Sequence, residues 1–396
     1  MPGTCRRVNI GCTESVMGVR RLLVALLLAL APFAAARYAF AASYYIAQAG
    51  LPDHADPTAR GSIAWYFTKY GGGNEYVLTT APNAADAAHS VYQLGRTLEV
   101  PTGAVLRGKT LSQLKANAGL DNRVMLELHD YSIVANLDLH GSSIAGIIVR
   151  ASHRVGVEIY DSTIHNTKND YTSDAPQAQW RPRPHLIVLD ACTHAYVARN
   201  ILRRAGCAPK LNPELWDGVA AAIYAPRNTD LTVDSNDIAF TLSAGIDLTG
   251  TVGADITDNV IRDTGLNALY PRSAEQIADG ITAYQNLNGG RDQNIWITYN
   301  EISAYHNHGI HLSGRGVHVE HNNVHDGTFN AIRIADQRSP PDCASNFSIR
   351  HNTAQAGRAN YPSIYIDNYA PASYDVSDNS WNGRPVGYSS GQDTCR

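Results

Sequence analysis

Five side chains in the second half of the sequence have the chemical types that acid–base catalysis and anion binding require. They are Asp247, Asp279, Tyr284, His311 and Arg333. A histidine can accept a proton near neutral pH, an arginine can neutralise an anion, and a phenol or carboxylic acid can protonate a leaving group. Asp247, His311 and Arg333 occupy the same place in a short repeated phrase, so we expect a repeating element to bring them together.

That phrase is a short strand in which apolar residues flank one variable position. Side chains alternate along a strand, so the apolar pair fills a core and the variable residue faces outward. The phrase recurs at residues 187–189, 245–248, 280–283, 309–312, 331–334 and 363–366.

A second strand in each repeat ends in an apolar residue that is followed three positions later by asparagine. Asparagine tolerates the left-handed backbone conformation and its amide can bond to the backbone, so stacked coils can place one at the same turn in every rung. The intervals run from 22 to 41 residues, which fits coils of one size interrupted by outward loops. We expect an asparagine ladder of seven residues, Asn200, Asn236, Asn259, Asn300, Asn322, Asn352 and Asn379.

The repeat resembles the pectate-lyase-like family of right-handed parallel β-helices, and residues 98–108 look like a first coil of that family. The resemblance implies an all-β solenoid, a right-handed parallel β-helix with an asparagine ladder. Helix-like patterns at 63–70 and 84–94 predict a short helical N-terminal cap, because a β-helix must protect its open end. The same scaffold carries lyases, hydrolases, epimerases and non-catalytic adhesins or tailspikes, so fold alone does not decide the chemistry.

Stacking the phrases in register gives an outward row with neighbours about 4.8 Å apart. The row is Asp247, Thr282, His311, Arg333 and Tyr365. Three residues just before the strands enter the same groove, Asp217, Asp279 and His308.

The first hypothesis is a lyase that cleaves a uronic-acid-containing glycan by β-elimination. Arg333 would neutralise the substrate carboxylate, His311 would remove the C5 proton, and Tyr284 would protonate the leaving oxygen. The same groups could instead reprotonate C5 and act as an epimerase.

The alternative hypothesis is a glycoside hydrolase that uses Asp247 and Asp279 as its two carboxylates. Residues 279–281, 308–310 and 333–335 resemble the polygalacturonase pattern. The sequence departs from that pattern because it lacks a consecutive Asp pair in the intervening coil and has Ala335 where lysine is usual. A further alternative is a non-catalytic carbohydrate-binding β-helix, which predicts a groove without paired ionisable groups.

Long inserts between the repeats would form walls along the groove. They carry aromatic and cationic side chains suited to stacking on sugar rings and pairing with carboxylates. The substrate-binding candidates are Lys168, Trp180 and Lys210 from these inserts, together with Asp217, His308 and Tyr365.

The N-terminus reads as an export signal, with Arg20 and Arg21 before the apolar run 22–31. We therefore expect a leader over residues 1–42, one β-helix domain over 43–396 with a cap region at 43–95, and a secreted or periplasmic product. Four cysteines remain after the leader, and we expect disulfides 192–207 and 343–395, with a structural metal as the rival interpretation.

Composition limits the partners. The net charge of −4 and the absence of a Lys/Arg run exclude a nucleic-acid-binding class, and no later segment is long and apolar enough to span a membrane. We expect a monomer whose partner is its polysaccharide substrate. Asp217, Asp247 and Asp279 could donate oxygens to calcium, but they form no tight acidic cluster, so no cofactor is predicted.

Overall fold

A computed structural model describes most of the chain beyond residue 39. The described residues are 40–48, 50–79, 91–117, 124–141, 146–167, 183–206, 220–266, 279–283, 293–312, 315–335, 346–358, 360–367, 374–382 and 384–388. The chain divides into two compact units, 1–41 and 42–396, and the description that follows concerns the second.

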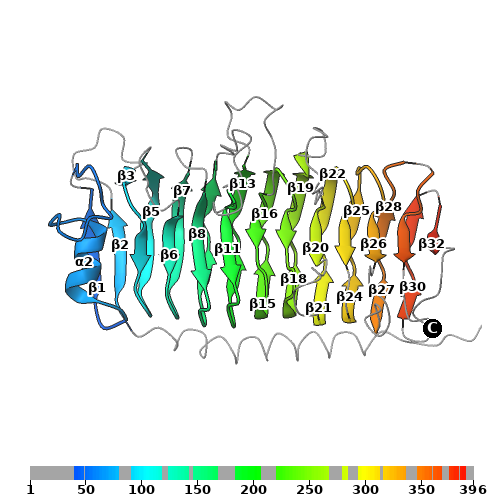
Figure 1. The fold of residues 1–396 in the computed structure, drawn as a ribbon, viewed down its shortest axis with the longest axis horizontal. Helices are drawn as coiled ribbons and strands as arrows, with labels where there is room; N and C mark the ends of the chain where they lie inside the picture. The colour runs from blue at the N-terminus through cyan, green and yellow to red at the C-terminus, as the bar shows by residue number, and fades with distance from the viewer. Residues whose placement is uncertain are drawn as a thin grey trace, which may run out of the picture. The chain divides into compact units, whose positions relative to one another are not determined.

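Short parallel strands stacked coil upon coil build this unit, as Figure 1 shows. One sheet has eleven strands, each paired with the equivalent strand of the next coil. We call it the groove sheet, because it contains the predicted outward row. Its strands are β4 (Leu98–Val100), β6 (Val124–Leu128), β8 (Ile147–Ser152), β11 (Ile187–Asp190), β14 (Ile223–Tyr224), β17 (Ile246–Asp247), β20 (Ile281–Ala283), β23 (Ile310–Leu312), β26 (Ile332–Ala335), β29 (Ile364–Asp367) and β32 (Val386–Tyr388).

The remaining strands form two further parallel stacks that close each coil. The first contains β9 (Glu158–Tyr160), β12 (Tyr196–Ala198), β15 (Thr229–Asp234), β18 (Val252–Thr257), β21 (Gln293–Thr298), β24 (Arg315–Glu320), β27 (Phe347–Arg350) and β30 (Tyr374–Ser377). The second contains β10 (Thr163–His165), β13 (Ile201–Ala205), β16 (Asp237–Thr241), β19 (Val260–Thr264), β22 (Glu301–Tyr305), β25 (Asn323–His325), β28 (Thr353–Gln355) and β31 (Ser380–Asn382). At the N-terminal end β1 (Ser43–Ala47), β2 (Glu75–Thr79), β3 (Val91–Leu94), β5 (Val105–Ala116) and β7 (Ile133–His140) continue the stacking. The prediction of an all-β parallel β-helix is confirmed.

The predicted asparagine ladder lies at the turn between these two stacks. Each side-chain amide from Asn200 to Asn352 donates to the amide oxygen of the next ladder residue at 2.9–3.0 Å. The predicted reason for asparagine was wrong in one respect. The left-handed residue is the one before each asparagine, with φ between 52° and 59° at Arg199, Ser235, Asp258, Tyr299, His321, His351 and Asp378.

The asparagine stabilises that turn from the following position. Its amide also donates to the carbonyl oxygen two residues earlier, as Asn300 does to Thr298 at 3.0 Å. The turn geometry is therefore satisfied inside each coil and the ladder joins the coils.

The apolar members of the repeated phrase form the core. Ile246, Ile281, Ile310, Ile332 and Ile364 are fully buried and lie in register on successive strands of the groove sheet. Burying each isoleucine side chain contributes on the order of 2 kcal/mol. This column fixes the direction of the residue that follows each isoleucine, because neighbouring side chains on a strand point to opposite faces.

One helix, α2 (Ile63–Tyr70), forms part of the N-terminal cap, as predicted. Ser62 is its N-cap, since its hydroxyl accepts a hydrogen bond from the backbone of Trp65 at 2.9 Å. Ile63 and Phe67 are buried against the first coils. The helical prediction for 84–94 was wrong at its described end, because Val91–Leu94 is strand β3, paired in parallel with β5. Pairing with an existing strand outweighed the weak local helical pattern.

Cys192 is buried, and its Sγ lies 3.4 Å from the carbonyl oxygen of Ala151. Its predicted partner Cys207, and Cys343 and Cys395, lie outside the described residues, so the disulfides stay predictions.

Within the described residues no helix has the length and apolar character needed to cross a membrane.

Candidate active site

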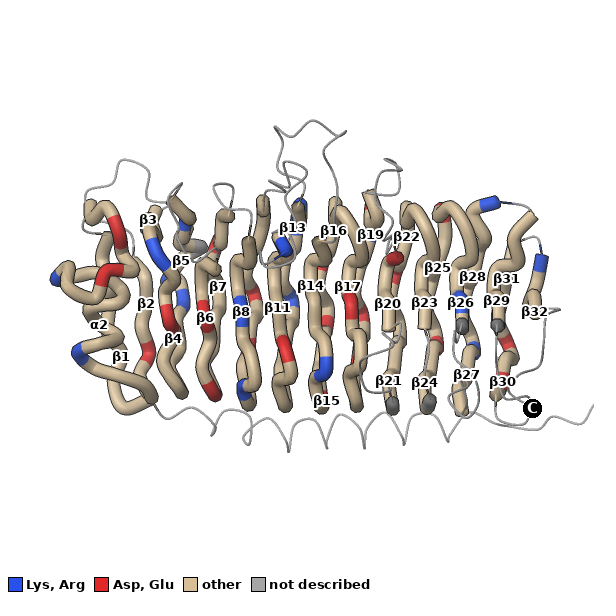
Figure 2. The backbone as a smooth tube through the Cα atoms, viewed as in Figure 1, with Lys and Arg blue, Asp and Glu red and all other residues tan. Residues whose placement is uncertain are grey.

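The structure places the predicted outward row on neighbouring strands of the groove sheet. Asp247 pairs with Thr282, Thr282 with His311, His311 with Arg333, and Arg333 with Tyr365. Figure 2 shows the acidic position on β17 and the basic position on β26 along this sheet. The register therefore agrees with the row expected from the sequence.

A second row lies three residues before the first. Asp279, His308 and Asn330 each precede a groove strand, and backbone hydrogen bonds from Gly280 to His308 (3.0 Å) and from Gly309 to Asn330 (3.2 Å) keep them in step. All three side chains are buried, with at most 5% of their surface exposed. The two rows together bring the polar groups of five consecutive coils into one site.

Asp279 orients His311. Its Oδ2 lies 3.2 Å from Nδ1 of His311, and its Oδ1 accepts from the Asn307 side chain at 2.8 Å and the His308 backbone at 3.1 Å. Burial acts to raise the pKa of Asp279, but the neighbouring His311 and His308 and these hydrogen bonds outweigh burial and lower it. An ionised carboxylate can only accept, so Nδ1 of His311 carries a proton.

His308 holds the guanidinium of Arg333. Nη1 of Arg333 lies 3.1 Å from Nε2 of His308, and the guanidinium carbon lies 5.9 Å from the ring centre of Tyr365. Burial lowers the pKa of His308 to about 3, with the charges of His311 and Arg333 adding to the effect and Asp279 opposing it. A neutral His308 whose Nε2 accepts from Arg333 must carry its proton on Nδ1.

Asp247 lies on β17, two strands before His311, and is 2% exposed. Its Oδ1 accepts from the hydroxyl of Thr249 at 2.7 Å and from the Thr249 backbone at 3.2 Å. Burial raises the pKa of Asp247, and the negative charge of Asp279 raises it further, against the Thr249 hydrogen bonds and the charge of Arg183. Next to it in the row, the buried hydroxyl of Thr282 has no hydrogen-bond partner among the described residues.

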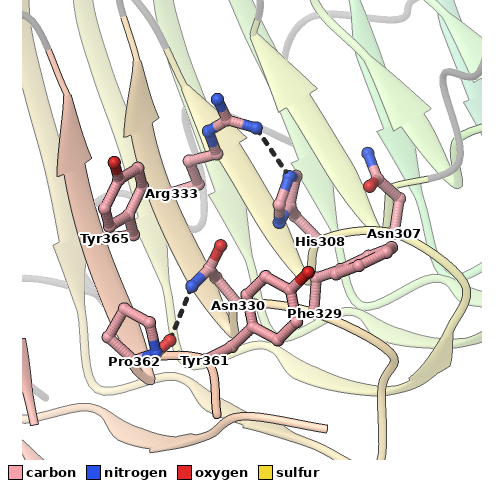
Figure 3. A pocket seen from close by; sticks show the side chains of 8 residues that line it. All are labelled: Asn307, His308, Phe329, Asn330, Arg333, Tyr361, Pro362 and Tyr365. Atoms are coloured by element: carbon pink, nitrogen blue, oxygen red, sulfur yellow. Dashed lines mark hydrogen bonds between the residues drawn. The ribbon is translucent and has the colours of Figure 1, made fainter. Parts of the chain in front are cut away.

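A cavity of about 490 Å³ opens beside Arg333, toward the C-terminal coils. Figure 3 shows His308 and Asn330 facing the space between Tyr365 on one side and Phe329 on the other. The amide of Asn330 donates to the carbonyl oxygen of Pro362 at 2.6 Å, which points its side-chain oxygen into the cavity. The lining residues are Asn307, His308, Phe329, Asn330, Arg333, Tyr361, Pro362 and Tyr365.

The remaining predicted site residues lie outside the described residues. They are Lys168, Trp180, Lys210, Asp217 and Tyr284, all in or beside the predicted wall loops, so their roles stay predictions. No group of three or more histidine, cysteine, aspartate or glutamate side chains arranged to hold a metal ion occurs in the part of the chain that the structure describes.

Sequence reasoning missed Asn330, Asn307 and the aromatic pair Phe329 and Tyr361. A signal existed for Asn330, because it precedes Ala331 as His308 precedes Gly309 in the repeated phrase. Phe329 and Tyr361 belong to turns, and their ring centres come within 5.0 Å only because two coils stack there. The repeated phrase carries no information about these turns.

The arrangement combines an oriented imidazole with a guanidinium on the next strand. A base beside a fixed cation suits removal of a proton from a carbon next to a carboxylate, since the cation stabilises the charge that develops on the carboxylate. The carboxylates of Asp247 and Asp279 do not face each other, because each accepts hydrogen bonds from neighbouring groups of the protein.

Comparison with solved structures finds the same architecture at low sequence identity. The mannuronan C-5 epimerase AlgE4 A-module of Azotobacter vinelandii is 14% identical with a TM-score of 0.56, over 88% of this chain and 100% of that one. The Dettilon tailspike protein is 14% identical with a TM-score of 0.53, over 85% of this chain and 68% of that one. Pectate lyase Pel9A is 10% identical with a TM-score of 0.50, over 90% and 82% of the two chains.

At these identities the likeness shows the fold. No curated protein matches the sequence. The family model described as the right handed beta helix region matches residues 185–387, which contain both polar rows and the ladder. The chain therefore belongs to the family of right-handed parallel β-helix proteins.

Proposed function

We propose that the protein is an exported polysaccharide lyase that cleaves a uronic-acid-containing glycan by β-elimination. The observation that carries this proposal is the pairing of an oriented base with a cation. His311 is held through Nδ1 by the buried Asp279, and the next strand of the groove sheet presents Arg333 directly beside it.

In the proposed reaction, Arg333 pairs with the carboxylate of the sugar that reacts. Nε2 of His311 takes the C5 proton, and the electron pair of the broken C5–H bond forms the C4–C5 double bond. The C4–O bond breaks, and Tyr284 protonates the leaving oxygen. Arg333 lowers the barrier most as negative charge builds on the carboxylate, because His308 and Tyr365 already hold the guanidinium in place.

The fold likeness is compatible with this proposal and with its near relatives. Two of the similar structures are a C-5 epimerase and a pectate lyase. Removal of the C5 proton is the first step of both elimination and epimerisation, so the same His311 and Arg333 serve either outcome.

A hydrolase has weaker support. Asp279 is committed to three hydrogen bonds and has a lowered pKa, and Asp247 is bonded to Thr249. Hydrolysis needs one of two facing carboxylates protonated and the other ionised, both against the glycosidic bond. The raised pKa of Asp247 fits the acid, but the partner carboxylate is turned toward His311.

The test is incubation of the purified protein with a panel of acidic and neutral polysaccharides. Ultraviolet absorbance of an unsaturated uronate and new reducing ends are followed together. The proposal predicts both signals on a uronate polymer. Reducing ends without absorbance would establish hydrolysis instead, and deuterium incorporation at C5 without new ends would establish epimerisation.

A further inference from the structure

The cavity beside Arg333 has the composition of a binding site for a negatively charged, hydroxylated ring. Three aromatic side chains line it, Phe329, Tyr361 and Tyr365, and none of its lining residues is acidic. Sugar rings stack on aromatic faces, while their hydroxyls need both hydrogen-bond donors and acceptors.

Two polar side chains in the cavity wall, His308 and Asn330, are suited to such hydroxyls. Nδ1 of His308 carries a proton and has no hydrogen-bond partner among the described residues, although the residue is only 5% exposed. Asn330 is 4% exposed and directs its side-chain oxygen into the same space. A buried donor without a partner costs free energy unless a ligand or water satisfies it. The cavity therefore offers the acceptor of Asn330, and the unsatisfied donor of His308 is buried in its wall.

A second cation lies beside this cavity, apart from Arg333. The guanidinium carbon of Arg358 is 5.1 Å from the ring centre of Phe329, and Arg358 is exposed. Its turn is anchored to the cavity wall, because Gly357 donates to the carbonyl oxygen of Phe329 at 3.0 Å and Tyr361 donates to that of Arg358 at 3.0 Å. No carboxylate of the described residues forms an ion pair with Arg358. An anchored arginine held over an aromatic ring keeps donors available for a carboxylate.

We infer that this cavity binds a second uronate of the same glycan chain, next to the one that reacts, and that Arg358 pairs with its carboxylate. The inference rests on the proposed function and narrows the substrate to glycans with at least two consecutive uronates. Arg333 serves the reacting unit and Arg358 the neighbouring unit. The ring of the second unit lies against Phe329 and Tyr361, with its hydroxyls at His308 and Asn330.

The test compares two uronate polymers, a homopolymer and one in which the same uronate alternates with a neutral sugar. In the Arg358→Gln variant, KM for the homopolymer should rise roughly fivefold while kcat stays within about twofold, as expected for one partly exposed charge pair. KM for the alternating polymer should not change. Arg199→Gln is the matched control, because Arg199 is an exposed arginine at a ladder turn, paired with Asp161, and should behave as wild type.

Phe329→Leu separates ring stacking from charge, and should raise KM for both polymers. Unchanged KM of Arg358→Gln on the homopolymer, or an equal rise on both polymers, would overturn the inference. Calorimetric binding of a hexauronate to the His311→Gln protein separates this inference from the proposed function. Weaker binding after adding Arg358→Gln supports the subsite even if no unsaturated product ever forms. Unchanged binding in a protein whose wild type is an active lyase rejects the subsite alone.

Discussion

His311 and Asp279 are 32 residues apart in the sequence, yet Nδ1 of the imidazole lies 3.2 Å from the carboxylate Oδ2. The two residues belong to consecutive coils, and the carboxylate is 2% exposed. A buried carboxylate in this position fixes the orientation of the imidazole and keeps a proton on its Nδ1.

Asp279→Asn removes the negative charge while keeping the size of the side chain. Because an amide can donate as well as accept, it no longer enforces the Nδ1–H tautomer of His311. We expect kcat on a uronate polymer to fall roughly 100-fold, with KM within about twofold of wild type. Initial rates from the absorbance of the unsaturated product measure this, and Asp138→Asn, at an acidic residue paired with His165 on another face, is the control. A rate equal to that of wild type would remove Asp279 from the site.

Arg333→Lys keeps the positive charge but loses the planar fork that both reaches Nε2 of His308 and lies over Tyr365. We expect the lysine variant to retain only about a hundredth of wild-type kcat/KM, and Arg333→Ala to lose turnover completely with an unchanged circular dichroism spectrum. Arg350→Ala serves as the control, since Arg350 lies on β27, outside the groove sheet, and pairs with Asp375 at 2.9 Å. Full activity of Arg333→Ala would dispose of the proposed site.

Asn300→Ala tests the ladder. Asn300 is 1% exposed, accepts from the backbone and amide of Asn259 at 3.0 Å, and donates to Asn322 at 2.9 Å. Its removal leaves the buried backbone N–H of Asn259 without a partner and takes away the amide's own bonds to the carbonyl oxygens of Ile256 and Thr298, so the free energy of unfolding should fall by about 3 kcal/mol. Denaturant titration measures the change. Asn323→Ala, one residue beyond the ladder and half-buried, should cost less than about 1 kcal/mol; equal costs for the two variants would contradict the prediction.

His185 predicts part of the acid sensitivity of the fold. Burial, followed by the charge of Arg183, lowers its pKa to about 3, while Nδ1 accepts from the Ala221 backbone at 2.9 Å. The unfolded chain takes up a proton on this imidazole near pH 6.5 and the folded chain does not. The contribution of neutral His185 to the free energy of unfolding is therefore complete above pH 6.5 and is lost as the pH falls toward 3.

When the pH falls from 7 to 5, His185 alone should lower the free energy of unfolding by about 2 kcal/mol. His185→Gln keeps an acceptor for Ala221 but cannot be protonated, so its unfolding free energy should decline less over that interval. Urea titrations of both proteins at the two pH values measure the difference. Parallel declines would show that His185 is protonated to the same extent in both states.

The sequence predicted the groove row because the rule behind it is local. The alternation of buried isoleucine and outward residue holds within each strand, and the registers from Asp247 to Tyr365 follow once the coils stack. The partner of Asp279 was not predictable in this way. Whether its carboxylate turns toward Asp247 or toward His311 depends on side-chain rotamers and on the twist between coils, neither of which a strand pattern specifies.

The cavity could be predicted from the sequence even less than the partner of Asp279. Phe329 and Tyr361 lie in turns whose lengths vary from coil to coil, so no repeated spacing marks them. The helical prediction for residues 84–94 was wrong at β3 for a related reason, because strand pairing with β5 overrides a weak local preference for a helix. Local periodicity therefore predicts which residues face outward, while turns and cross-coil contacts decide what they meet.

The ladder has a consequence for how such a protein can change in evolution. Each coil contains its own ladder asparagine, its own buried isoleucine and its own outward residue. It contacts the neighbouring coils through parallel strand pairing and the ladder hydrogen bonds. Duplicating or deleting one whole rung would lengthen or shorten the trough by a single position while leaving the rest of the stack intact. Under the proposed function, the length of glycan bound could therefore change independently of the few residues proposed to carry out the chemistry.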